Sequence, residues 1–515
     1  MQGTMRKAVQ TAKPKAMLRT NQQVAASREG STKRYCLGVA LALLLSGCAV
    51  GPDYQAPDIA LPDAWPEHIT LSQYEREEWR YWWHQFDDPA LNQLIARATQ
   101  DNLELTIQLA RIQEARAQLG FADAEQFPTV GFQAEATRER TPGAALPIDF
   151  EPVQDLITST NNQYSLAASL EYELDLWGRL ASEREAALAA FQESQFARDA
   201  AEIGVIGDVV TTYFNLKSAE AQQQLLDETL ASYEETYRLQ RLRYEHGDIS
   251  ELELRQAEAE WQGLRSEQPS LSQQIESLRG ALGVLVGMTP NELVTALDTG
   301  NTQLANIAQP TAIPRVMPSE LLQRRPDIRS AEASLIAATA QVGVAEANRL
   351  PSLNLSSFIG TTAASSSDLF TDSARAWGLG ASVMGPLFDF GRTRAGVESA
   401  EARVEQAEAQ YRLTVLTAFN EVRDALFSYD FTSQRAEAVD KQISAIERTR
   451  DLAVLMYDQG QVSQIERLDA ERNLLSARLE QADARREQLA SAATLFKTLG
   501  GGWQLEDQAA SQVGP

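Results

Sequence analysis

The chain has 515 residues and a formal net charge of −25, with 71 Asp and Glu residues against 46 Lys and Arg residues. This acidic balance argues against nucleic acid as a partner, because phosphate groups are bound by basic side chains. The chain has two cysteines, Cys36 in the expected export signal and Cys48 at the expected lipid site, so no internal disulfide is expected and stability must come from packing. The three histidines (His68, His84 and His246) lack the spacing of a metal site.

Residues 1–47 have the features of an export signal with a long leader. Lys33 and Arg34 provide positive charge, and the apolar stretch Tyr35–Leu45 is too short to span a bilayer as a helix. Small residues then precede Cys48, as they do where a lipoprotein signal peptidase cuts. We therefore expect cleavage before Cys48 and a covalent lipid on it, the alternative being an ordinary secretory signal with an accidental cysteine.

A segment of residues 48–85 is expected to form a lipidated, extended arm. Residues Ala49 to Thr70 are rich in proline and polar side chains, which favours little regular secondary structure. A tryptophan-rich patch, Trp79 to Phe86, follows and should lead into a helix.

The rest of the chain contains an internal repeat, which we place at residues 86–300 and 301–503, before a C-terminal tail at 504–515. Each copy is expected to run helix, strand, strand, long helix, turn, helix. The spacing from Gly178 to Gly391 and from Gly247 to Gly460 is the same, 213 residues. The matching segments are Gln126–Val130 with Arg349–Leu353, Asp175–Arg179 with Asp389–Arg392, Tyr244–Ser250 with Tyr457–Ser463, and Ala281–Gly283 with Thr498–Gly500.

Each copy is predicted to contain one very long helix. The segment Leu180–Tyr244 has no proline and carries apolar residues at steps of three and four, as does Val404–Tyr429 in the second copy. A continuous helix over Leu180–Tyr244 would be about 100 Å long at ~1.5 Å per residue, too long for a globular domain. Because alanine is common at the interface positions, we expect helices packed against neighbours on two sides, as in the wall of a tube.

Two segments per copy alternate between apolar and polar residues. The apolar positions are Val130, Phe132, Ala134 and Ala136; Tyr164, Leu166, Ala168, Leu170 and Tyr172; Leu353, Leu355 and Ile359; and Trp377, Leu379, Ala381 and Val383. This pattern is typical of transmembrane β-strands, but also of a soluble hairpin with one buried face. Closed membrane barrels need at least about eight strands, and an open edge is not tolerated in lipid. If these strands span a membrane, several chains must therefore share one barrel, and the loops Thr141–Thr160 and Thr361–Ser373 would be extracellular.

Several motifs together resemble the outer-membrane factors of tripartite efflux pumps, the OprM- and NodT-like lipoproteins of the TolC family. They are the small residues before Cys48 with Gly51–Tyr54, the arm Leu61–Trp65, the segment Trp82–Leu91, the pair Asp175–Arg179 and Asp389–Arg392, the segment Arg324–Asp327, and the paired turns. The resemblance implies an α+β, mainly α fold in which a homotrimer forms a 12-stranded β-barrel in outer-membrane lipid and a 12-helix periplasmic tunnel. It also implies a passive duct whose partners are a periplasmic adaptor protein and an inner-membrane RND-type transporter.

The resemblance also assigns functional positions. The turns that would meet the adaptor comprise Tyr244, Gly247, Ser250, Tyr457, Gly460 and Ser463. Ile465, Glu466 and Asp469 match a constriction that would gate the duct, and three Asp469 carboxylates near one axis would raise one another's pKa. The alternative for Asp469 is a solvated side chain paired with Arg472. In the first copy Gln256 stands where the second has Asp469, so one acidic ring is expected.

We expect no catalysis and no cofactor apart from the lipid on Cys48, because no nucleophile, nucleotide-binding or metal motif is present. Two other hypotheses remain open: a periplasmic coiled-coil lipoprotein without a pore, and a type I protein-secretion duct. The exported substrate is not encoded here, since a passive duct takes its specificity from pump and adaptor.

Overall fold

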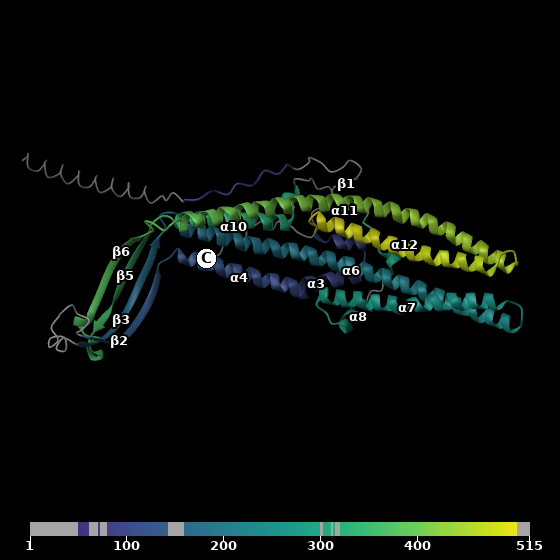
Figure 1. The fold of residues 1–515 in the computed structure, drawn as a ribbon, viewed down its shortest axis with the longest axis horizontal. Coiled ribbons are helices and arrows are strands. Elements are labelled where there is room, and N and C mark those ends of the chain that lie inside the picture. The colour runs from purple at the N-terminus through teal and green to yellow at the C-terminus, as the bar shows by residue number, and fades with distance from the viewer. Residues whose placement is uncertain are drawn as a thin grey trace, which may run out of the picture. The chain divides into compact units, whose positions relative to one another are not determined.

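The computed structural model describes residues 50–60, 71–72, 80–142, 159–298, 302–310, 313–314 and 320–501. The chain divides into two compact units, described separately here. The first is built mainly from Ala122–Arg184 and Ala340–Glu398 and contains a β-sheet. The second, mainly Asp53–Phe121, Glu185–Thr339 and the chain from Ser399 onward, is helical (Figure 1). The expected cleavage site at Cys48, most of the loop after Thr141 and the tail at 504–515 lie outside the described residues.

Helices make up most of the described chain. In chain order, the helices up to and including the first long helix are η1 (Trp82–Phe86), α3 (Pro89–Asp101), α4 (Leu103–Glu125) and α6 (Arg179–Glu245). The helices between the two long helices are α7 (Glu251–Val286), α8 (Pro290–Asp298), η3 (Leu304–Asn306), α9 (Leu321–Arg324) and α10 (Pro326–Ala347). The last two are α11 (Arg392–Asp458) and α12 (Gln464–Thr498).

The two long helices confirm the prediction of one per copy. Each contains 67 residues, and α11 begins and ends 213 residues after α6. Figure 1 shows α7 beside α6 and α12 beside α11. Buried side chains join each pair: Leu226, Tyr233 and Leu264 between α6 and α7, and Ile443, Leu474 and Ala477 between α11 and α12.

The ends of α7 and α12 correct one detail of the repeat. Gly287 ends α7 with φ +69° and Gly500 follows α12 with φ +78°, again 213 residues apart. Gly283, which the sequence match paired with Gly500, lies inside α7. Only the glycine that closes a helix needs the left-handed conformation, and a single spacing therefore holds from the start of α6 to the end of α12.

The helical unit is centred on an aromatic core that begins in the tryptophan-rich patch. Trp82 stacks on Phe496 with ring centroids 5.5 Å apart, and Phe86 meets Phe214 edge-on at 4.9 Å. Asp88 then caps α3, accepting hydrogen bonds from the backbone of Ala90 and Leu91. As expected, the patch leads into a helix, although Trp79 lies outside the described residues.

The sheet unit contains four antiparallel strands in the order β2-β3-β5-β6. They are β2 (Thr129–Thr141), β3 (Ser159–Leu174), β5 (Ser352–Ala363) and β6 (Arg375–Met384). The register places Phe132 opposite Ala168, Ala168 opposite Ile359, and Ile359 opposite Trp377. One face is therefore mainly apolar, as the alternating pattern predicts, and Phe132, Ile359 and Trp377 are each at least 70% exposed in the single chain.

Two further strands, β1 (Leu71–Ser72) and β4 (Ile313–Pro314), form a short parallel pair. Residues 50–60 have no regular secondary structure, as expected for the arm, and the Tyr54 hydroxyl donates to Glu332 at 3.0 Å. Between Thr361 and Ser373 the chain forms two short 3-10 helices, η5 (Ser366–Asp368) and η6 (Asp372–Ala374). Within the described ranges no single helix is long and apolar enough to cross a membrane, and α7 with α8 passes that test only as a pair bent by 96°.

Candidate functional site

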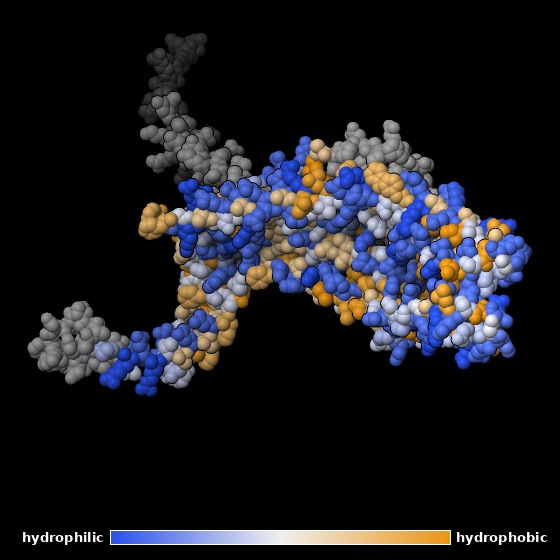
Figure 2. Space-filling view, turned by 45° about the vertical axis from the view of Figure 1, so that its right-hand side comes forward, coloured by the Kyte–Doolittle hydropathy of each residue, from blue (hydrophilic) through white to orange (hydrophobic). Residues whose placement is uncertain are grey.

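The candidate site consists of the two turns between helices. The first turn, residues 246–250, joins α6 to α7, and the second turn, residues 459–463, joins α11 to α12. In Figure 2 the right-hand end carries scattered hydrophobic residues on a mostly hydrophilic surface. Exposed apolar side chains near the turns are Leu239, Leu242, Leu252, Leu455 and Ile465.

Both turns have the same backbone design. Gly247 has φ +78° and Gly460 φ +71°, and a Cβ added at either would meet no atom within 4 Å. Conformation rather than space therefore calls for glycine at these positions. Each following helix starts with a capping box, Ser250 with Glu253 and Ser463 with Glu466.

The two tyrosines before the turns differ in their contacts. The Tyr457 hydroxyl accepts hydrogen bonds from Gln240 Nε2 and Arg243 Nη1, each 3.1 Å long, and Arg467 lies 5.2 Å over its ring. Tyr457 thus ties α11 to α6, joining the two helical hairpins. The Tyr244 side chain is 40% exposed, and its hydroxyl makes no hydrogen bond to any residue that the structure describes.

Of the residues expected to form the constriction, Ile465 is 49% exposed and follows the second turn directly. The Glu466 carboxylate accepts from the backbone N–H and the hydroxyl of Ser463 at 2.7 and 2.9 Å. The backbone hydrogen bond, followed by that from the hydroxyl, lowers the pKa of Glu466 below its ordinary value. In the single chain this carboxylate is therefore engaged with the start of its own helix.

Asp469 is paired with Arg472, three residues further along α12. Arg472 also lies 3.3 Å from Glu260 Oε1 on α7, so one guanidinium bridges two carboxylates from two hairpins. About half of the Asp469 side chain is exposed, and pairs of this kind contribute little to stability individually. The pairing with Arg472 that the sequence offered as the alternative for Asp469 is thus present in the single chain.

The sequence reasoning missed a buried polar seam between α6 and α12, close to the turns. Gln464 is 4% exposed, and neither of its amide atoms has a hydrogen-bond partner among the described residues. The Tyr233 hydroxyl, Gln240 Oε1 and Glu471 Oε2 are likewise buried without partners. Burial, and next the nearby Glu471 carboxylate, raise the pKa of Tyr233. Burying such atoms without a partner costs free energy, which lowers the contribution of this seam to stability.

The described residues contain no group of three or more His, Cys, Asp or Glu side chains that could hold a metal ion. His84 and His246, the histidines within these ranges, lie in η1 and in the first turn.

A family model described as "Outer membrane efflux protein" matches residues 94–288 and 317–501. The antibiotic efflux pump outer membrane protein ArpC of Pseudomonas putida is 32% identical over 480 residues, covering 92% of this chain and 96% of ArpC. The cation efflux system protein CusC of Escherichia coli O6:H1 is 30% identical over 473 residues, covering 90% of this chain and 98% of CusC.

Among solved structures, the CmeC outer membrane channel of Campylobacter jejuni superposes with a TM-score of 0.81 at 26% sequence identity. The match covers 90% of this chain and 97% of CmeC. The similarity thus extends over nearly the full length of these proteins.

Proposed function

Because the chain belongs to the outer membrane efflux protein family, we propose that three copies form the exit duct of a tripartite pump for small organic molecules. Membership confirms the resemblance read from the motifs, the mainly α fold with a small sheet, and the location in the outer membrane. The chain is an outer-membrane efflux channel protein. The relatives are efflux channel proteins rather than enzymes, and we expect no catalysis here.

The four-stranded sheet is the observation that supports the proposed trimer. One chain supplies four strands with an exposed apolar face, and β2 and β6 each leave one edge unpaired. Strand edges cannot remain open in lipid, and four strands are too few to close a barrel. Joining β6 of one chain to β2 of the next would pair every edge in a closed ring.

The proposed cargo is a small organic molecule, as the name of ArpC suggests for that relative. Export of a cation is the second candidate, favoured by the 30% identity to CusC. A strain lacking the gene should become more sensitive to antibiotics or solvents and regain resistance on complementation. Sensitivity to metal cations alone would favour the second candidate.

The proposed partners dock at the turns. A periplasmic adaptor would contact the first and second turns, in which we include Tyr244, Gly247, Ser250, Tyr457, Gly460 and Ser463, and an RND-type transporter would supply the energy. The identical backbone of both turns supports this, because a repeated adaptor hairpin could meet either one in the same way. Cysteines placed at the turns should cross-link to the adaptor in membranes.

We further propose that residues 1–47 are removed and that Cys48 carries a lipid anchor. In this division, the arm at 48–85 precedes repeats at 86–300 and 301–503, and the tail is 504–515. Mass spectrometry of the mature N-terminus tests this, and an unmodified N-terminus other than Cys48 would refute it.

The proposed gate consists of Ile465, Glu466 and Asp469, and Asp469 is the decisive member. Asp469→Ala should raise the resting conductance of the channel in planar bilayers, because it removes the acidic ring and one of the two carboxylate partners of Arg472. Gln256→Ala, at the equivalent position of the first repeat, is the matched control. Equal conductance of both variants would remove Asp469 from the gate.

The assembly itself is tested on purified mature protein. Light scattering in detergent should give the mass of a trimer, and bilayers should show small, mostly closed pores. A monomer without pores would contradict the duct and favour the coiled-coil spacer. Loss of secretion of a protein substrate in the deletion strain, without drug sensitivity, would favour the type I secretion duct.

A further inference from the structure

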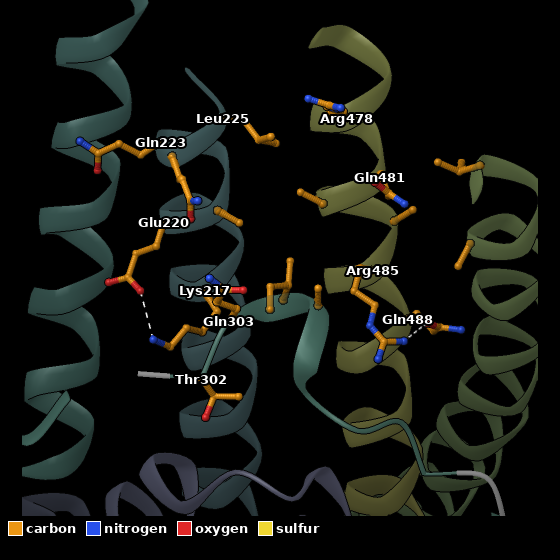
Figure 3. A pocket seen from close by; sticks show the side chains of 18 of the residues that line it. Lys217, Glu220, Gln223, Leu225, Thr302, Gln303, Arg478, Gln481, Arg485 and Gln488 are labelled. Atoms are coloured by element: carbon orange, nitrogen blue, oxygen red, sulfur yellow. Dashed lines mark hydrogen bonds and ion pairs between the residues drawn. The ribbon is translucent and has the colours of Figure 1, made fainter. Parts of the chain in front are cut away.

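The helical unit contains a cavity of ≈ 1090 Å³ away from the turns. It is lined by residues of α6, α7, α8, α11 and α12 and by the segment 302–309 (Figure 3). Figure 3 shows Lys217 and Glu220 on α6, and Arg478 and Arg485 on α12, around the same space. The volume is of the size that small-molecule sites have.

Most cations around this cavity are neutralised by carboxylates. Lys217 Nζ lies 3.2 Å from Glu220, and Arg279 lies 3.1 Å from the same carboxylate. Arg478 is 3.0 Å from Glu447. Arg279 also lies 2.8 Å from Glu276, so each of these three cations has a carboxylate partner.

Arg485 differs from these cations because its hydrogen-bond partners are uncharged. Its Nη1 donates to Gln488 Oε1 and its Nη2 to the Ile307 carbonyl, both at 2.6 Å, and no described carboxylate forms an ion pair with it. Burial lowers the pKa of Arg485, because it disfavours the charged guanidinium, and the Asp440 carboxylate offsets this in part. The guanidinium has further N–H donors that these two bonds do not use.

The internal repeat indicates that the pairing of one helix with the next does not require this arginine. With the 213-residue spacing, the hydrogen bond from Gln481 to Asp440 (2.8 Å) has its counterpart between Gln268 and Asp227 (3.0 Å). The positions equivalent to Arg485 and Gln488 are Ser272 and Ile275. The α6–α7 pair thus forms the same inter-helix bond without an arginine, so that bond does not require Arg485.

We propose that the cavity binds a small amphipathic organic monoanion, whose carboxylate is held by Arg485 beside Gln488. A guanidinium whose hydrogen-bond partners are uncharged suits one negative charge, and carboxylates form strong, directional hydrogen bonds with arginine. Leu225, Leu304 and Val439 line the same cavity and provide apolar surface for the hydrocarbon part. The site is built within one chain, so a trimer would carry one per subunit.

The test is calorimetric titration of 4-phenylbutyrate into the full mature protein in lipid nanodiscs, with empty nanodiscs as the blank. We expect saturable binding with one site per chain, and at least a tenfold loss of affinity in Arg485→Gln. Arg265→Gln, on α7 beside Trp261 and outside this cavity, should leave the affinity unchanged. Absence of saturable binding, or equal affinity of Arg485→Gln and the unaltered chain, would overturn the proposal.

A second measurement needs no variant. The neutral analogue 4-phenylbutyramide should bind the unaltered chain at least tenfold more weakly than the carboxylate, and equal affinities would overturn the proposal even if Arg485→Gln did not fold. Neither titration involves a pump or transport, so each outcome is independent of the proposed function.

Discussion

The contact between the two hairpins at Tyr457 makes a quantitative prediction for Tyr457→Phe. The substitution keeps the ring under Arg467 but removes the oxygen that accepts from Gln240 and Arg243. Gln240 is 4% exposed and would lose its partner inside the protein, at a cost of about 1–2 kcal/mol. Arg243 is exposed and can turn to water, so its share is small.

If this contact holds the hairpins together, Tyr457→Phe should favour their separation by roughly 5- to 30-fold per chain. Single-channel recording in planar bilayers should then show a higher open probability with an unchanged unit conductance. Tyr244→Phe is the matched control, because its hydroxyl bonds to no described residue. Equal open probabilities for Tyr457→Phe and the unaltered channel, or the same increase in both variants, would refute the reasoning.

Two further predictions concern stability. Tyr213→Phe removes the 2.7 Å hydrogen bond to Asp88, a carboxylate that is completely buried, and should destabilise the helical unit by about 1–3 kcal/mol, seen as a lower temperature of thermal unfolding. The lowered pKa of Glu466 means that its capping contribution is complete above the ordinary value of 4.5 and is lost as the pH falls through the lowered one. The protection of amides at the start of α12 against hydrogen exchange, relative to the intrinsic rate at each pH, should therefore fall on acidification. Glu466→Gln should abolish that loss of protection while Glu253→Gln leaves it intact; protection that does not change with pH in the unaltered chain would contradict this.

Local patterns alone predicted much of the architecture. The proline-free segment Leu180–Tyr244 matches α6 within one residue at each end, because periodicity and capping act between residues a few positions apart. The alternating segments form strands for the same reason. Their register also accounts for the less regular alternation of apolar and polar residues in β5. There Ser357 and Thr361 stand on the mainly apolar face.

The sequence match wrongly paired Gly283, which lies inside α7, with Gly500, which follows α12. A Leu-Gly match in sequence does not reveal which glycine takes positive φ, and the structure shows that Gly287 closes the helix. Likewise, the sequence suggested Arg472 as a partner of Asp469, which the structure shows, but did not reveal that Ser463 binds the Glu466 carboxylate.

What the sequence determined by itself was the two long helices, the four strands of the sheet and the two turns, since these follow from residues close together along the chain. Only the tertiary structure decided which distant side chains meet: Tyr457 with Gln240, Tyr213 with Asp88, and Arg485 with the Ile307 carbonyl. These contacts span more than one hundred residues and depend on how helix faces pack, which periodicity leaves open. The same packing leaves the Gln464 amide without a hydrogen-bond partner among the described residues and gives Arg485 uncharged hydrogen-bond partners.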